Sequence, residues 1–251
     1  MNDYIITLVQ KGLRDDGRDF KEYRPIKIEY GVSAKSAEGS ARVKIGDTEV
    51  IAGVKMEIGE PFPDSPDEGV LIVNAELIPM ASPEFESGPP RIDSIELSRV
   101  TDRCIRESGF IDFGKLCIKK KEKVWIVFVD IYPINDSGNL FDAACLAAVA
   151  ALKDAKFPAL DGDKADYTKH TKELPLKKAP TSCTVINIKD KFLVDPMTEE
   201  EKDAMARLTV ASIGSTVCAL QKGGEKPLSI EDIDKMISLA IEKNNELVKL
   251  L

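Results

Sequence analysis

Three arginines recur at helical spacing in one short stretch of the chain. The stretch reads Glu96-Leu97-Ser98-Arg99-Val100-Thr101-Asp102-Arg103-Cys104-Ile105-Arg106. At about 100° per residue, Arg99, Arg103 and Arg106 fall within roughly 60° of one another, while an apolar seam of Leu97, Val100 and Cys104 lies on the far side. Guanidinium forks bind phosphate oxygens in bidentate fashion. The pattern therefore predicts a helix that packs on a core and offers arginines to a polyanion such as RNA or a nucleotide.

The same stretch has a second interpretation. Glu96, Asp102 and Glu107 lie three or four residues from these arginines, a spacing that also forms salt bridges along a solvated helix face. Spacing alone favours this second interpretation, because charged helix faces are common. The phosphate hypothesis needs support from elsewhere in the chain.

The composition is that of a soluble globular protein with an acidic surface. The 251 residues are 43% hydrophobic, enough to bury a sizeable core in one large domain or two small ones, and the formal net charge is −8. An acidic body argues against indiscriminate binding of nucleic acid, so any RNA contact must be local. An acidic body with a small arginine cluster suits a subunit that contributes one wall of a binding site while a partner supplies the rest.

Targeting signals and reactive side chains are sparse. No apolar run approaches the roughly 20 residues of a membrane helix, and the N-terminus lacks a basic segment followed by an apolar one, so we expect a cytoplasmic protein that contacts no membrane. The five cysteines include no CxxC pair, which indicates reduced core residues and neither a zinc site nor a disulfide framework. His170 is the only histidine, so a Ser-His-Asp triad is not expected.

Strand and helix patterns alternate through the first part of the chain. After a short helix within the first 20 or so residues, strands are predicted over 26–30, 39–45, 48–55 and 69–77, with a Gly46-Asp47 hairpin turn. The arginine helix is predicted over about 92–108, ending at Gly109. Strands over 114–118 and 124–132 precede a helix over 140–153 that is apolar almost all round and therefore buried.

The second part repeats this alternation. A polar, lysine-rich segment over 158–182 marks a boundary between two halves. Beyond it we predict strands over 184–188 and 191–195, a helix from about 198, an apolar strand over 208–221 and a last helix over 229–250 with Ser229 at its start. The alternation predicts an α+β or mixed α/β architecture with crossover helices.

Four motifs stand in order along the chain. They are Arg14-Asp15-Asp16-Gly17-Arg18 followed by Arg24-Pro25-Ile26, the arginine helix, the strand-loop-helix unit from Trp125 to Leu152, and Leu193-Val194-Asp195-Pro196 with Glu199-Glu200-Glu201. Together they resemble the RNase PH family over nearly the whole chain. More narrowly, they are similar to the non-catalytic RNase PH-like ring subunit of the archaeal exosome.

The resemblance implies a fold and an assembly. The fold would be the α+β RNase PH-like fold of two related βαβ-type halves with a ribosomal protein S5 domain 2-like core, here residues 1–160 and 161–251 in one compact unit. The chain would alternate with a catalytic RNase PH-like exosome subunit in a hexameric ring, a trimer of heterodimers, and RNA-binding cap subunits would join it. The catalytic subunit degrades single-stranded RNA from its 3′ end, with inorganic phosphate attacking the last phosphodiester.

One departure from the family bears on activity. Active members carry a Gly-Gly-Thr-Arg run before the buried helix, whereas this chain has Ser137-Gly138-Asn139-Leu140-Phe141. Losing the threonine hydroxyl and the arginine charge removes groups worth on the order of 2 to 4 kcal/mol each to a developing anion. The resemblance therefore implies a damaged phosphate cradle and no catalytic residue in this chain.

The carboxylates of the family site are partly retained. Active members place two aspartates six residues apart, and the matching positions here are Asp195 and Glu201. The pair could in principle chelate a cation. A structural interpretation is favoured, because Asp195-Pro196 is typical of a turn and Glu199 to Glu201 form an acidic first turn of a helix. We expect neither a metal site nor another cofactor.

The resemblance changes the balance for the arginine helix. Arg99, Arg103 and Arg106 match family positions that line the RNA path beside the active subunit; Arg99 and Arg103 are the first candidates, because Arg106 could pair with Asp102. The expected function is to bind RNA and complete a neighbouring subunit's active site for 3′-to-5′ phosphorolysis. Two alternatives remain: a phosphate-dependent 3′-to-5′ exoribonuclease in its own right, and an interaction module that touches no RNA.

Overall fold

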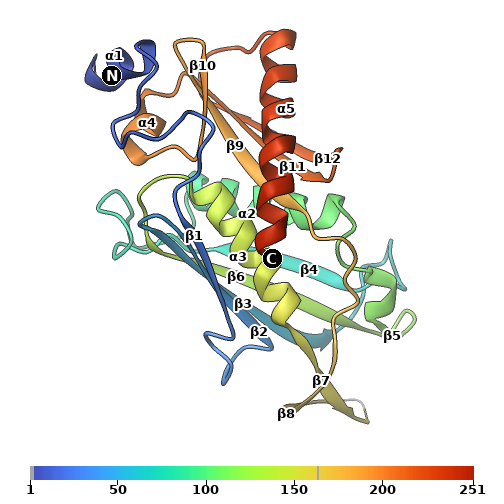
Figure 1. Cartoon of the computed structure of the whole chain (residues 1–251). Helices are drawn as coiled ribbons and strands as arrows, with labels where there is room; N and C mark the ends of the chain where they lie inside the picture. Colours follow the sequence, from blue (N-terminus) through green and yellow to red (C-terminus); the bar gives the residue numbers. More distant parts are fainter. Residues whose placement is uncertain (1–2, 163) are drawn as a thin grey trace.

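The chain folds into two main β-sheets with helices between and around them (Figure 1). The computed structural model describes residues 3–162 and 164–251. The larger sheet has the order β1-β2-β3-β6-β4, with β5 beside β6. Its strands are β1 (Ile26–Tyr30), β2 (Gly39–Ile45), β3 (Thr48–Gly59), β4 (Val70–Ala75), β5 (Cys117–Lys119) and β6 (Lys123–Asn135). Among the described strands of this sheet, β4 and β6 alone pair in parallel, and their connection runs through α2 (Ile92–Glu107).

The second sheet is antiparallel throughout and comes from the C-terminal part of the chain. Its order is β10-β9-β11-β12. The strands are β9 (Thr181–Ile188), β10 (Lys191–Val194), β11 (Ala206–Ile213) and β12 (Thr216–Gly223). The short helix α4 (Thr198–Asp203) links β10 to β11, and α5 (Ile230–Leu247) packs on β9 and β11. As predicted, Ser229 caps α5, its hydroxyl accepting from the Asp232 N–H at 3.1 Å.

Helix α3 (Leu140–Asp154) joins the two sheets. It packs on β2 and β3 of the larger sheet and on β9 of the smaller one. Every residue from Asp142 to Leu152 is buried, which confirms the prediction of a buried, alanine-rich helix. Small side chains let α3 lie close to the strands. A Cβ added at Gly39 of β2 would come within 2.5 Å of backbone atoms of Ala151 and Ala155.

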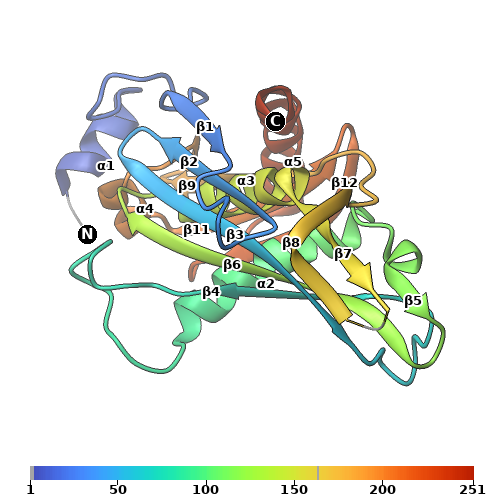
Figure 2. The same ribbon diagram turned by 90° about the horizontal axis from the view of Figure 1, so that it is seen from below.

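The N-terminal segment crosses from one sheet to the other. Helix α1 (Asp3–Gln10) packs its apolar face on the second sheet, against Ile186, Ile188 and Leu193. Residues 11–25, the N-terminal strap, then lead to β1 at the edge of the larger sheet (Figure 2). The start of the chain therefore depends on both sheets.

Two predicted strands differ from the structure. Over 114–118 the chain forms a 3-10 helix (Phe113–Leu116) followed by the short strand β5, because Leu116 is buried close against Gly69. Over 208–221 a single strand was predicted, but Gly214 adopts φ +57° and turns the chain, which produces the hairpin of β11 and β12. In each case a local contact or turn overrides the hydrophobic pattern.

The predicted boundary segment contains a hairpin. Among the described strands, β7 (Lys156–Asp161) and β8 (Lys164–Glu173) pair with each other alone, and Figure 1 shows this hairpin extending away from the two sheets. Most residues of β8 are exposed, which explains its polar composition. The proposed halves 1–160 and 161–251 would meet inside this hairpin, and that division stays a prediction.

Cysteine placement follows the expectation in part. Cys104, Cys145 and Cys183 are buried, whereas Cys117 and Cys218 are partly exposed. Among the described helices, none combines the length and the apolar content needed to cross a bilayer.

The close packing of α3 on β2 predicts contrasting effects for two glycines. Gly39→Ala should lower the free energy of unfolding by about 2 to 3 kcal/mol, because its methyl group would overlap the α3 backbone. Gly53→Ala on β3 is the matched control: its methyl group would have no neighbour closer than 4.0 Å, so stability should stay the same or rise by up to about 1 kcal/mol. Urea unfolding of both variants checks this, and equal effects would contradict the packing account.

Candidate functional site

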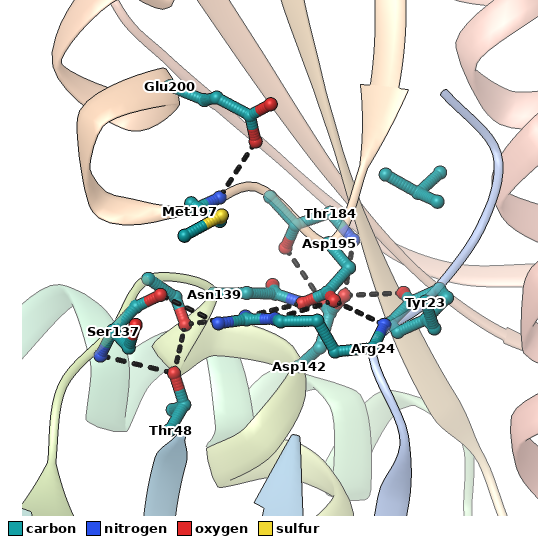
Figure 3. Close-up of polar contacts among 12 residues, drawn as sticks. Tyr23, Arg24, Thr48, Ser137, Asn139, Asp142, Thr184, Asp195, Met197 and Glu200 are labelled. Atoms are coloured by element: carbon teal, nitrogen blue, oxygen red, sulfur yellow. Dashed lines mark hydrogen bonds and ion pairs between the residues drawn. The ribbon is translucent and has the colours of Figure 1, made fainter. Parts of the chain in front are cut away.

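The loop before α3 is closed by hydrogen bonds within the chain (Figure 3). We call residues 136–139 the cradle loop. Three successive backbone N–H groups donate to the chain's own oxygens. The acceptors are Thr48 Oγ1 for Ser137 (3.2 Å), Asp136 Oδ1 for Gly138 (3.0 Å) and Glu201 Oε1 for Asn139 (2.9 Å). Amides that could bind a phosphate from this loop are therefore already paired.

The carbonyls of the cradle loop are paired as well. Arg24 donates from Nη1 to the Ser137 carbonyl at 2.7 Å and from Nη2 to the Gly138 carbonyl at 3.2 Å. The Thr48 hydroxyl donates to the Gly138 carbonyl at 2.6 Å. Gly138 adopts φ +87°, and a Cβ there would lie 2.4 Å from the Pro196 carbonyl oxygen. The charged Arg24 and the neutral Thr48 therefore both fix the carbonyl groups of the cradle loop.

Asp195 lies at the centre of this arrangement and is fully buried. Its carboxylate accepts from Arg24 Nη2 (2.6 Å), Arg24 Nε (2.8 Å), Arg24 N (2.8 Å), Arg18 Nη1 (2.8 Å) and Asn139 Nδ2 (2.9 Å). Burial acts to raise the pKa of Asp195, but the hydrogen bonds and charge of Arg24 prevail and hold the pKa below its usual value. Asp195 is therefore an ionised anchor for two arginines.

A divalent cation does not fit between Asp195 and Glu201 here. Asn139 occupies the place between them, with its side-chain amide on Asp195 and its backbone N–H on Glu201. The guanidinium groups of Arg18 and Arg24 already satisfy the Asp195 oxygens. Across the ranges 3–162 and 164–251, no group of three or more His, Cys, Asp or Glu side chains is placed to hold a metal ion.

A second buried ion pair fastens the N-terminal strap to α4. Arg14 makes a bidentate contact with Glu200, from Nε at 2.9 Å and from Nη2 at 2.6 Å. The same guanidinium donates to the carbonyls of Val194 (3.1 Å) and Asp195 (2.8 Å). Within the acidic turn Glu199–Glu201, Glu200 therefore has a structural role. Glu200 also accepts a hydrogen bond from the Met197 N–H at 2.9 Å.

Asp142, in the first turn of α3, connects the helix to the second sheet. It accepts from the Tyr23 hydroxyl at 2.6 Å, the Thr184 hydroxyl at 2.8 Å and the Thr184 N–H at 3.1 Å. Burial raises the pKa of Asp142 to about 6, although these donors oppose the shift. Asp142 therefore serves as a joint between the strap, α3 and β9.

Beyond the loop, a cavity of about 340 Å³ opens at the N-terminus of α3. Phe141 lines this cavity, and the Arg207 guanidinium lies 4.0 Å from the Phe141 ring centroid. Arg207 also bonds Glu96 at 2.6 Å. Burial raises the pKa of Glu201, which also lines the cavity, to about 7. Among the described residues that line this cavity, Arg207 is the one cation and Glu96 already pairs with it, so the cavity offers phosphate no unpaired positive charge.

The arginine helix is α2, and its core-facing seam is as predicted. Leu97, Val100 and Cys104 are buried. Arg99 is exposed and has no hydrogen bond or ion pair with any residue that the structure describes. Arg103 is half-buried and donates from Nη1 to Gln221 Oε1 on β12 at 3.4 Å.

Arg106 is engaged differently. It binds Asp102 at 2.6 Å and the Leu71 carbonyl of β4 at 3.0 Å, which confirms that Arg106 can pair with Asp102. Arg103 and Arg106 therefore turn toward opposite neighbours, and the three arginines do not form one cluster. Of the three, Arg99 is the most available to an external anion.

One contact network was not foreseen. The sequence pattern paired Glu96 with arginines of its own helix, but the structure pairs it with Arg207 of β11 and with Gln221 Nε2 of β12 (3.1 Å). Gln221 thus links Glu96 to Arg103. No local signal could have revealed these contacts, because the partners lie more than 100 residues apart in sequence.

Comparison with known families identifies this architecture. Domain 1 of the 3′ exoribonuclease family, the RNase PH domain, matches residues 22–158, and domain 2 matches residues 178–243. The chain belongs to the RNase PH family.

Similar proteins of this family come from archaeal exosomes. The chain is 49% identical to the exosome complex component Rrp42 of Methanothermobacter thermautotrophicus, covering 98% of this chain and 92% of that protein. It is 50% identical to the component of the same name in Methanocella arvoryzae, over 98% and 93% of the two chains. A structure described as the Archaeoglobus fulgidus exosome with RNA bound to the active site superposes with a TM-score of 0.91 at 46% identity, covering 98% of this chain and 96% of that one. The RNase PH-like α+β fold is therefore shown.

The raised pKa of Glu201 predicts a pH-dependent stability. Folding raises this pKa from 4.5 to about 7, so the folded state holds the proton more tightly than the unfolded chain. The stabilisation that the protonated Glu201 contributes is therefore present at low pH and is lost as the pH rises through 7. Between pH 6 and 8, the free energy of unfolding should fall by about 1 kcal/mol more in the wild type than in Glu201→Gln. Urea unfolding at both pH values measures the difference, and equal pH slopes would contradict this assignment.

Proposed function

We propose that this chain is a non-catalytic, RNA-binding ring subunit of an archaeal exosome. The closed cradle loop is the observation that carries the proposal, because its three N–H groups are bonded within the chain. Similarity to exosome components named Rrp42 supports membership of such a complex. In this role the chain binds RNA and completes the active site of a neighbouring catalytic RNase PH-like subunit, which performs 3′-to-5′ phosphorolysis.

The proposed contribution to RNA binding is electrostatic. Arg99 presents to solvent a guanidinium that has no partner among the described residues, and Arg103 keeps donors beyond the one shared with Gln221. Contacts of this kind hold backbone phosphates without reading bases, which suits degradation of any single-stranded RNA. Arg106 contributes less, because Asp102 already neutralises its charge.

The assembly and its location follow from the same proposal. The chain alternates with its catalytic partner in a hexameric ring, a trimer of heterodimers, to which RNA-binding cap subunits attach, in the cytoplasm. The net charge of −8 fits a subunit whose attraction for RNA is confined to one helix. The partner supplies the phosphate cradle that Ser137 to Phe141 no longer provide.

Charge reversal on α2 tests the RNA contact. In the ring assembled with its catalytic partner, Arg99→Glu with Arg103→Glu should weaken RNA binding by roughly tenfold or more and slow degradation of RNA at limiting concentration. For Arg99→Gln or Arg103→Gln, the slope of log affinity against log salt should fall by about 0.7 per lost phosphate contact. Binding titrations at several salt concentrations provide the measurement.

Arg106→Gln is the internal control for this experiment. Its effect on RNA affinity should be smaller than that of either other arginine, because the wild-type charge is paired. Unchanged affinity and degradation in a ring carrying both charge reversals would mean that the arginines serve subunit contacts and not RNA.

A further inference from the structure

A groove of about 580 Å³ lies beside the first half of α2 and apart from the cradle loop. Its walls are the segment 76–91 that joins β4 to α2, the edge strand β4 and the end of β6. Figure 2 shows segment 76–91 as a long loop that stands out from the larger sheet. Leu77, Phe85, Ile95 and Tyr132 give the groove an apolar lining.

Large apolar side chains remain exposed on and around this groove. Tyr132 is 38% exposed and Ile95 is 50% exposed, and next to the groove Met80 and Ile92 reach 68% and 78%. Single exposed apolar side chains are common on protein surfaces, but here four lie in one region. A contiguous apolar surface of this kind marks a contact site.

The charged side chains that line the groove are mainly acidic. Its carboxylates belong to Glu76, Glu84, Glu86, Asp93 and Asp130. Arg91 is the one cationic side chain among the described lining residues, and Glu86 pairs with it. Lys202 neutralises Glu84 at 3.1 Å. Within the described part of the chain, Glu76, Asp93 and Asp130 have no cationic partner.

We propose that this groove docks a basic segment of the neighbouring ring subunit, with lysine or arginine side chains set between apolar ones. The inference rests on the proposed function, which supplies the neighbour. Cationic side chains would meet the unpaired carboxylates, and apolar side chains would cover Ile95 and Tyr132. RNA is disfavoured as the occupant, because its phosphates would face Glu76 and Asp130.

The position of the groove gives the contact a consequence for RNA. Ser98 lines the groove and Arg99 is the next residue of α2. A partner segment seated there would approach α2 within one residue of Arg99, which is exposed and has no partner in the described part of the chain. The two subunits would then hold the RNA strand at their junction, with one helix serving both contacts.

Reversal of two groove charges tests the docking. Glu76→Lys with Asp130→Lys should raise the dissociation constant for the catalytic RNase PH-like partner at least about tenfold, because like charges would face each other across the interface. The matched control is Glu57→Lys with Asp234→Lys, two exposed carboxylates outside the groove that also have no cationic partner in the described structure. Both pairs change the net charge equally. Mass measurement of the co-expressed complex and a binding titration give the readout.

A milder variant guards against misfolding. Asp130 accepts a hydrogen bond from Asn74 Nδ2 at 3.3 Å, and Glu76→Gln with Asp130→Asn keeps the side-chain shape and one acceptor oxygen in each while removing both charges. It should weaken the complex by a smaller factor than the lysine variant while its unfolding transition stays at the wild-type position.

The outcomes separate this inference from the function on which it rests. A wild-type chain that forms no ring with the catalytic partner would overturn the proposed function and this inference together. A wild-type ring whose stability is unaffected by the groove substitutions would overturn the inference alone. If the wild-type chain associates with itself and the substitutions abolish this, the occupant is a second copy and the inference is wrong. If the substitutions change RNA affinity while assembly stays intact, the occupant is RNA and the inference is likewise wrong.

Discussion

A buried carboxylate, that of Asp195, joins three parts of the chain that are distant in sequence. Arg18 and Arg24 reach it from the N-terminal strap, Asn139 reaches it from the cradle loop, and Asp195 itself directly follows β10 of the second sheet. Removing one partner from a buried ion pair of this kind costs about 3 to 5 kcal/mol, because the remaining charge is left unpaired. Asp195 adopts φ +46°, a backbone conformation that aspartate tolerates better than most residues and that places its carboxylate toward the strap. The relative placement of the two sheets depends on this contact, together with the Asp142 joint and the packing of α3.

The same interactions support the proposal that this chain does not carry out phosphorolysis itself. A phosphate cradle needs free N–H groups and positive charge at the N-terminus of the helix. Here Thr48, Asp136 and Glu201 accept those N–H groups, and the first two residues of α3, Leu140 and Phe141, are apolar. The interactions that stabilise the fold thus occupy the groups that phosphate would require. By contrast, Arg99 of α2 is exposed and has no partner among the described residues, so its guanidinium is available to a polyanion.

The sequence predicted those features that depend on local periodicity. Helix α3 and the seam of α2 were recovered because burial on one face, or on all faces, leaves a regular apolar pattern. The resemblance to the RNase PH family located the departure in the run from Ser137 to Phe141. The pairing of Glu96 with Arg207 was beyond reach, because a long-range ion pair leaves no periodic trace. For the same reason, the split of the 208–221 run at Gly214 required knowledge of the backbone angle. How Asn139 lies between Asp195 and Glu201 also became visible only in three dimensions.

The central claim is a division of labour, in which this chain guides RNA and another subunit carries out the chemistry. The most direct test is to measure nucleoside diphosphate release from single-stranded RNA, with phosphate and magnesium present, for the purified chain, for its catalytic partner and for the co-expressed complex. The account predicts no release by the chain alone, and release by a complex of hexameric mass that exceeds that of the partner alone. Phosphate-dependent release by the purified chain alone would contradict it.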